Sequence, residues 1–336
     1  MKNSDLTFGV IGCGRIGTRH AGHIKKLATL NAVCDIDIKR CEEIMDSKRS
    51  HFNSIDELLN SDLKPDVISI CSPNGLHATH TIKALKAGCH VLCEKPMALT
   101  AYDCGEMIKE SEKANKRLFI VKQNRFNPPI KALKEIVDAG KLGRIFSIQL
   151  NCFWNRNSNY YEDDPWKGSI EMDGGTLYTQ YSHFIDLIYW LFGDIESVKG
   201  FSDNFNHSES IEFEDTGVVA MRFRSGALGT IHHTINSNIQ NMEGSITIFS
   251  EGGTIKVGGQ YLNKIDYQNT NGFELTHEIG NEANKYGKYQ GSMSNHGEVY
   301  ENIINVLTNK AEIITNSYEG LKTVEIIEKI YKAYQK

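Results

Sequence analysis

Short apolar runs alternate with segments of helical periodicity through the first third of the chain. Strand-like apolar runs lie at 6–11, 30–34, 67–71, 90–93 and 118–121. Between them, apolar residues recur with the period of a helix at 16–28, 38–45, 55–59, 76–87 and 101–114. This alternation predicts an α/β fold with a parallel, doubly wound sheet.

The pattern changes after residue 123. Helices are predicted at 130–139, within 171–192, at 297–307 and at 318–334. Strand-like runs lie at 144–154, 195–201, 216–223, 227–234, 244–249, 254–257 and 264–267. Consecutive strands without helices between them predict a large, open and mostly antiparallel sheet. The second part of the chain is therefore expected to be an α+β domain.

A glycine-rich turn joins the first predicted strand to the first predicted helix. Gly12 would allow the tight turn, Gly14 the close approach of a pyrophosphate, and Gly17 close packing of the helix on the strand. Arg15 and Ile16 open the helix, whose free N–H groups would hold the phosphates. An ordinary turn is the alternative, but the preceding strand and following helix favour a dinucleotide site.

Asp35 follows the second predicted strand, where this kind of site needs an acidic residue. Its carboxylate could accept hydrogen bonds from both ribose hydroxyls and would repel a 2′-phosphate. NAD is therefore favoured over NADP as the cofactor, although Arg40 keeps NADP as an alternative. We expect a dinucleotide-binding Rossmann domain at 1–123. We expect a substrate-binding and oligomerisation domain at 124–336, whose last helices could pack back on the first domain.

Polar residues follow three later predicted strands, those at 67–71, 90–93 and 118–121, at the edge where open α/β sheets bind ligands. For Ser72-Pro73-Asn74 the alternative is an ordinary turn, since proline, asparagine and glycine are common turn residues. The residues of this edge that we expect to contact the cofactor are Ser72, Pro73, Asn74, His77, Glu94, Lys95 and Gln123.

Lys95 is the first catalytic candidate. It follows an apolar strand, and Pro96 restricts its backbone. A lysine beside a nicotinamide and a substrate hydroxyl can bind the alkoxide that develops during oxidation, or shuttle the proton if its pKa is lowered. The alternative is a solvated surface lysine.

His183 is the second catalytic candidate. In the predicted helix within 171–192, Thr179 and His183 are four residues apart and would share one face. Asp186 lies one turn beyond the histidine and could orient it. Histidine is the usual catalytic base near neutral pH. The alternative is that His183 is a buried, hydrogen-bonded residue with a structural role. The residues alone leave open whether Lys95 or His183 accepts the proton.

Two polar-aromatic stretches supply candidate substrate contacts. Arg125 and Arg156 could clamp an anionic substrate, and nearby aromatic side chains offer stacking planes for a base or sugar ring. The alternative is that the stretch with Arg125 is an ordinary domain junction and the stretch with Arg156 a polar loop, without a role in substrate binding. The expected substrate-binding residues are Arg125, Arg156, Tyr160, Trp166, Thr179 and His183.

Composition narrows the function classes. Of the 336 residues 24% are charged, and the net charge is −5. Because the chain is not basic, a nucleic-acid partner is not expected. No apolar run reaches membrane-spanning length and no signal-peptide pattern is present, so we expect no membrane partner and a cytoplasmic location. The eight cysteines form no Cys-x-x-Cys pair and are expected to be reduced thiols. His77 with His80, and His232 with His233, lack ligand spacing, so no metal is expected.

Taken together, the glycine motif, Asp35, Glu94-Lys95-Pro96 and the segment from Gly174-Gly175 to His183 and Asp186 resemble the glucose–fructose oxidoreductase/inositol dehydrogenase/MocA family. The resemblance covers nearly the whole chain. Within the family, further stretches are similar to the WlbA-type UDP-2-acetamido-2-deoxyglucuronate 3-dehydrogenases: 121–125, 153–161, 173–183 and 224–229.

This resemblance implies NAD-linked oxidation at C3 of a nucleotide sugar in surface-polysaccharide biosynthesis. It implies Lys95 and His183 as the catalytic pair, and a tetramer built through the open sheets, with a dimer as the other expected homo-oligomer. The chain departs from many family members in having Thr179 and Tyr181 where they have aspartate and glycine. The alternatives are a dehydrogenase of a free sugar or cyclitol, and an NAD-containing ligand-sensing protein.

Overall fold

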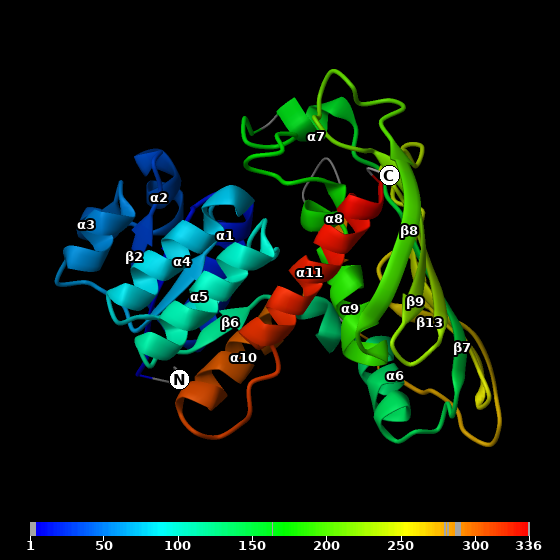
Figure 1. The fold of residues 1–336 in the computed structure, drawn as a ribbon. Coiled ribbons are helices and arrows are strands. Elements are labelled where there is room, and N and C mark those ends of the chain that lie inside the picture. Colours follow the sequence, from blue (N-terminus) through cyan, green and yellow to red (C-terminus); the bar gives the residue numbers. More distant parts are fainter. Residues whose placement is uncertain (1–4, 163, 279, 281, 286–289, 335–336) are drawn as a thin grey trace. The chain divides into compact units, whose positions relative to one another are not determined.

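The computed structural model describes residues 5–162, 164–278, 280, 282–285 and 290–334 (Figure 1). These residues form two compact units. The first contains residues up to 121 together with 296–324, and the second contains 122–295 together with the end of the chain from 325. No described helix is both long and apolar enough to cross a membrane.

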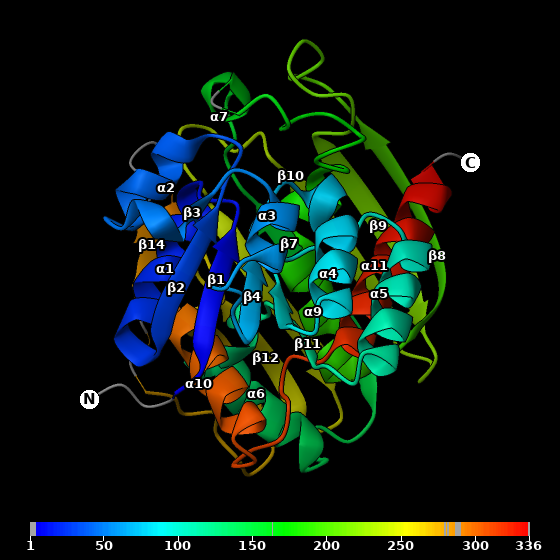
Figure 2. The same cartoon turned by 90° about the vertical axis from the view of Figure 1, so that its left-hand side faces the viewer.

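The first unit is built on a parallel six-stranded sheet with the order β3-β2-β1-β4-β5-β6. Strands β2, β1 and β4 run side by side in Figure 2. The strands are β1 (Thr7–Ile11), β2 (Thr29–Cys34), β3 (His51–Phe52), β4 (Val67–Ile70), β5 (His90–Cys93) and β6 (Leu118–Ile120). This confirms the predicted doubly wound sheet, to which the short strand β3 is an addition.

Helices connect these strands and pack on the sheet. Each parallel connection needs such a crossover, because successive strands run in the same direction. Helix α1 packs with α10, and α4 packs with α5. The helices of this unit are α1 (Arg15–Leu27), α2 (Ile38–Ile44), α3 (Ile55–Asn60), α4 (His77–Lys86), α5 (Ala101–Lys113) and α10 (His296–Leu307), with 3-10 turns η1 (Lys48–Ser50) and η2 (Asn74–Leu76).

The second unit is built on a seven-stranded sheet with the order β13-β12-β11-β7-β10-β9-β8. All neighbours are antiparallel except β10 and β7, so the predicted mostly antiparallel sheet is confirmed. Its strands are β7 (Ile145–Phe153), β8 (Ile195–Asp203), β9 (Thr216–Phe223), β10 (Leu228–Thr234), β11 (Glu243–Ser250), β12 (Gly253–Gly258) and β13 (Lys264–Thr270). A separate pair, β14 (Ala283–Lys285) and β15 (Gln290–Met293), was not predicted.

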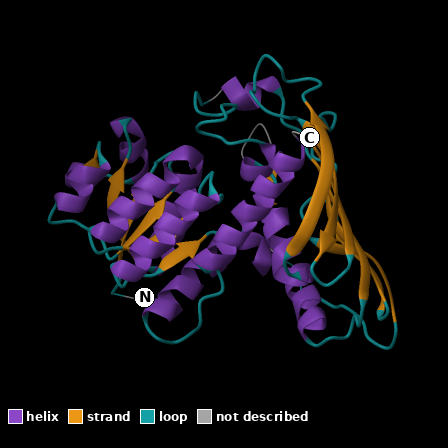
Figure 3. Ribbon diagram, viewed as in Figure 1, coloured by secondary structure: helices purple, strands orange, loops and turns teal. Residues whose placement is uncertain are grey.

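One face of the seven-stranded sheet is covered by helices, and the other is bare (Figures 1 and 3). Buried and exposed positions alternate along β9 and β10, as expected for a sheet with one covered face. The helical elements of this unit are η3 (Gln123–Phe126), α6 (Pro128–Asp138), α7 (Ser158–Glu162), α8 (Thr176–Thr179) and α9 (Ser182–Phe192). Helix α11 (Ser317–Tyr334) begins in the first unit and ends in the second.

The apolar helix predicted within 171–192 is interrupted, so the prediction that it runs unbroken from Thr179 to His183 is wrong. The structure has two helices, α8 and α9, and Tyr181 between them has φ −115° and ψ 0°, which is not helical. The Tyr181 hydroxyl donates a 2.6 Å hydrogen bond to the carbonyl of Thr234 in β10, and the ring is buried. Packing against the sheet therefore overrides the local helical pattern at this point.

Candidate active site

The glycine turn between β1 and α1 is fixed by close backbone packing. Gly12 has φ +90°, and a Cβ placed there would lie 2.5 Å from the Cys71 carbonyl oxygen. A Cβ on Gly17 would lie 1.9 Å from the Gly12 carbonyl oxygen. Both positions therefore require glycine for the fold itself, as the motif predicts.

Gly14 is different, because the protein alone does not require a glycine there. Its backbone is extended, with φ −70° and ψ −164°, and a Cβ would meet only the Arg40 guanidinium at 3.7 Å. No side chain caps the N-terminus of α1 at this residue. The open space and the helix N–H groups fit the pyrophosphate of a dinucleotide.

Asp35 ties the second strand to this turn. One carboxylate oxygen accepts a 2.7 Å hydrogen bond from the Cys13 amide, and the other accepts a 2.9 Å bond from the Asp37 amide. Each oxygen keeps a lone pair for a ribose hydroxyl. Arg40, the residue that would favour NADP, lies 3.8 Å from the carboxylate of Asp37.

His77 joins the two loops that follow β4 and β5. Its ring nitrogens lie 2.7 Å from the Pro96 carbonyl oxygen and 2.9 Å from the Ser72 carbonyl oxygen. Burial lowers the pKa of this imidazole, although the two carbonyls and Glu94 oppose that shift. Because both nitrogens face backbone groups, the geometry favours a role in fixing the loops over direct cofactor contact.

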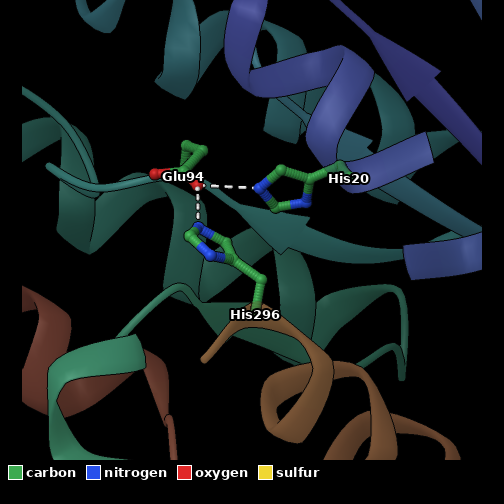
Figure 4. Close-up of side chains that lie close together, drawn as sticks. All are labelled: His20, Glu94 and His296. Atoms are coloured by element: carbon green, nitrogen blue, oxygen red, sulfur yellow. Dashed lines mark hydrogen bonds and ion pairs between the residues drawn. The ribbon is translucent and has the colours of Figure 1, made fainter. Parts of the chain in front are cut away.

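Glu94 lies at the end of β5 and is the centre of a buried cluster (Figure 4). Its Oε1 is 2.8 Å from His20 Nε2 and 3.6 Å from His296 Nε2, and its Oε2 accepts a 3.0 Å bond from the Lys95 amide. Burial alone would raise the Glu94 pKa, but the two histidines outweigh it and hold that pKa well below its usual range. The predicted contact of Glu94 with a cofactor is therefore disfavoured, because protein groups already surround its carboxylate.

Sequence reasoning missed the two histidines of this cluster and Tyr300 beside them. The Tyr300 hydroxyl lies 2.7 Å from His20 Nδ1 and 2.8 Å from the Ser69 hydroxyl. The signal in the sequence was that His20 shares the helical spacing of the apolar residues Ala21 and Ile24, which the structure shows to be the buried face of α1. His296 is 202 positions from Glu94, and nothing local connects them.

In the second unit, His183 is buried near the start of α9 and its Nε2 lies 2.9 Å from the amide nitrogen of Gln123. Thr179 does not share a helix with it. The Thr179 hydroxyl donates to Asp173, to the carbonyl oxygen at 3.1 Å and to the carboxylate. The expected single helix face carrying Thr179 and His183 is therefore corrected.

Asp186 has buried cationic partners. Its carboxylate accepts bonds of 2.8 and 2.6 Å from Arg125 and lies 2.9 Å from Lys122 Nζ. Burial would raise the Asp186 pKa, but the two cations outweigh it and hold that pKa below its usual range. With Arg125 itself buried, this geometry favours a structural role for that arginine over the expected substrate clamp.

Arg156 is also buried, and it lies in a polar-aromatic setting. Its guanidinium donates 2.7 Å to Gln180 and 3.2 Å to Asn241, and it lies over the rings of Trp154 and Tyr160. Of the remaining predicted substrate residues, Tyr160 is buried against this group and Trp166 is half-buried.

Comparisons with known proteins agree with this geometry. Residues 6–122 match the family model described as the oxidoreductase family, NAD-binding Rossmann fold. Residues 130–256 match the family model of the GFO/IDH/MocA C-terminal domain. A myo-inositol 2-dehydrogenase of Thermotoga maritima is 31% identical over 261 residues, which is 74% of each chain. The chain belongs to the GFO/IDH/MocA family.

Two solved structures resemble this GFO/IDH/MocA member over nearly its full length. The WlbA dehydrogenase of Bordetella pertussis, in complex with NADH and UDP-GlcNAcA, is 35% identical, with 99% of this chain and 97% of that chain covered and a TM-score of 0.86. The WlbA dehydrogenase of Chromobacterium violaceum, with the same two ligands, is 34% identical, with 100% and 95% covered and a TM-score of 0.89. The protein is thus an NAD-dependent dehydrogenase of the GFO/IDH/MocA sugar and cyclitol group.

Proposed function

We propose that this enzyme oxidises the C3 hydroxyl of UDP-2-acetamido-2-deoxyglucuronate, or of a related nucleotide sugar, to a ketone. The observation that supports this most is the similarity of 34–35% over whole chains to two dehydrogenases whose structures hold NADH and UDP-GlcNAcA. A surface-polysaccharide pathway is the setting that this substrate implies.

Lys95 and His183 are the proposed catalytic pair. Bound NAD⁺ would accept the hydride from C3, and the hydroxyl proton must leave to a nearby basic group. Lys95 follows β5 at the carboxyl edge of the sheet, where ligands of open α/β folds bind. His183 sits with Gln123, which would fix the orientation of its ring.

Holding the cofactor is the proposed task of the first unit. Gly12, Gly14 and Gly17, with Arg15 and Ile16, would hold the pyrophosphate at the start of α1. Asp35 would bind the ribose through the oxygens that already orient the turn. These residues bind and orient, so that most of the rate comes from positioning and charge stabilisation.

Substrate recognition is proposed for the polar-aromatic region around Arg156. Its guanidinium, held over two aromatic rings, is a preorganised site for a carboxylate or phosphate. Tyr160, Trp166 and Thr179 remain proposed contacts.

The alternative is a dehydrogenase of a free sugar or cyclitol. It is favoured by the 31% identity to a protein named myo-inositol 2-dehydrogenase. The two functions differ in whether the uridine diphosphate is needed for turnover.

The test is NADH formation by the purified protein with UDP-2-acetamido-2-deoxyglucuronate, with UDP-N-acetylglucosamine and with myo-inositol. We expect turnover of the first compound and at least tenfold lower kcat/KM for the others, a difference of about 1.4 kcal/mol. Lys95→Met should abolish turnover while NADH still binds. Turnover of myo-inositol without turnover of the nucleotide sugar would contradict the proposal.

We also propose a homo-oligomer, a tetramer or a dimer, assembled through the bare sheet face. Apolar side chains stand on that face, including Phe201 at 87% exposure and Leu228 at 50%. Such apolar surface on a sheet usually marks an interface.

A cytoplasmic location is supported by eight free, buried cysteines.

A further inference from the structure

The buried cluster around Glu94 holds a negative charge one residue before the proposed catalytic lysine. Glu94 directly follows β5, His20 lies in α1 and His296 is the first residue of α10, all within the first unit (Figure 4). All three side chains are nine-tenths buried or more. A carboxylate in such a place persists only if hydrogen bonds replace its lost hydration.

The hydrogen-bond pattern around His20 supplies such a bond. A carboxylate is an acceptor, so His20 Nε2 carries a proton and donates it to Glu94 at 2.8 Å. A neutral His20 then accepts at Nδ1 from the Tyr300 hydroxyl, which accepts in turn from Ser69. If His20 gains a proton, the two hydroxyls reverse direction and no bond is lost.

His296 adds a second polar ring on the same oxygen. Its Nε2 lies 3.6 Å from Glu94 Oε1, and neither ring nitrogen has a hydrogen-bond partner within standard geometry among the described residues. An N–H on this ring therefore gains most by pointing to the carboxylate. Burial lowers the His296 pKa, so the ring contributes as a neutral dipole.

Glu94 is also linked directly to Lys95. Its second oxygen, Oε2, accepts the Lys95 amide at 3.0 Å, so the carboxylate fixes the backbone from which the catalytic side chain starts. Glu94 and Lys95 are also adjacent in the chain, and an ionised carboxylate close to an ammonium group favours the charged form of that group. Other titratable or charged groups that act on Glu94 or the two histidines are Arg19, His23, Cys71, His77, Cys93 and Tyr300.

We propose that His20 and His296 are positioning residues that hold Glu94 as a carboxylate, and that this charge keeps Lys95 as an ammonium ion during turnover. Lys95 then donates a hydrogen bond to the alkoxide developing on the substrate. The proton of the hydroxyl goes to His183 instead. This assignment rests on the proposed function, because it divides two roles between residues of that site.

The first experiment measures Lys95 without turnover. The rate at which an amine reagent labels Lys95 is followed against pH by mass spectrometry, in the parent protein and in Glu94→Gln. Removing the charge should lower the labelling midpoint of Lys95 by about 0.5–1 pH unit. His20→Phe should give the same shift, since Glu94 without its donor takes up a proton, and the double variant should shift no further.

His23→Asn is the matched control. His23 lies one turn after His20 on α1 and stacks on His296, but among the described residues it makes no hydrogen bond to Glu94. The Lys95 midpoint should stay unchanged in this variant. If Glu94→Gln does not fold, His20→Phe alone decides the matter. An unshifted midpoint in the folded variants overturns the proposal, as does one equivalent of a transition metal that the parent protein holds and Glu94→Gln loses.

The second experiment compares Lys95→Arg with Lys95→Met. Arginine can donate to an alkoxide but cannot accept a proton at working pH. We expect Lys95→Arg to keep a kcat at least tenfold above that of Lys95→Met. Equal loss in both variants contradicts the ammonium role. If no nucleotide sugar is turned over at all, the proposed function fails while the labelling result still stands.

Discussion

Gly14→Ala separates cofactor binding from folding. The added methyl group would enter the open space at the start of α1, where its nearest protein neighbour is the Arg40 guanidinium at 3.7 Å. The extended backbone of Gly14 is accessible to alanine. The loss of a good N-cap residue and the gain from a less flexible unfolded chain roughly cancel, so stability should change by less than about 0.5 kcal/mol.

NADH binding should respond quite differently to the same change. A methyl group between the backbone and a pyrophosphate is an overpacking defect, which costs about 1–3 kcal/mol. The Kd for NADH should therefore rise by about 5- to 150-fold. Titration calorimetry gives this Kd, and thermal unfolding without NADH gives the stability.

Gly17→Ala is the contrasting variant, on the same motif. Its methyl carbon would lie 1.9 Å from the carbonyl oxygen of Gly12, so the backbone itself must move. We expect a loss of about 3 kcal/mol or more and a fall in Tm of roughly 6–12 °C. If Gly14→Ala binds NADH like the parent, the pyrophosphate does not occupy the space assigned to it. If the variant unfolds like Gly17→Ala, that space is not open in the protein.

Three further predictions concern the second unit. Asp186→Asn should lower the free energy of unfolding, measured with denaturant, by about 3–5 kcal/mol, because two buried cations lose their partner. As a control, Asp56→Asn breaks the exposed Asp56–Lys83 pair and should lower it by less than about 1 kcal/mol. Equal losses in the two variants would refute this. Burial raises the pKa of Glu214 to about 7, so the folded protein favours its protonated form. The free energy of unfolding should therefore fall by about 3 kcal/mol as pH rises from about 4.5 to 7. Glu214→Gln should abolish that slope, and a slope that persists in the variant counts against Glu214 as its source. Leu228→Asp on the bare sheet face should reduce the mass measured by sedimentation, while Ile170→Asp in an exposed loop should not; an unchanged mass for Leu228→Asp would move the interface elsewhere.

The sequence predicts the parts of this fold that local pattern controls. The strand–helix alternation of the first unit and the strand runs of the second are local features, and the structure confirms both sheets. The glycine turn was also predictable, since backbone packing at Gly12 and Gly17 leaves no other residue possible. In these segments, local pattern and tertiary packing require the same conformation.

The rest depends on contacts between distant residues. The break between α8 and α9 comes from the Tyr181 hydroxyl reaching β10, 53 positions along the chain, while the local periodicity runs on through it. The acidic partner expected to orient His183 is bonded instead to Arg125, 61 positions away. A helical pattern shows which residues share a face, but it does not show which partner a buried charge will find.

The order in which the chain is synthesised matters for the first unit. Residues 296–324 belong to this unit although the whole second unit up to residue 295 is made before them. A nascent chain that ends before residue 296 would already carry Glu94 and His20 but would lack His296 and Tyr300, which complete their cluster. All six strands of its sheet are made early, but the nucleotide-binding unit cannot gain α10 or complete the packing around Glu94 until residues 122–295 have been synthesised.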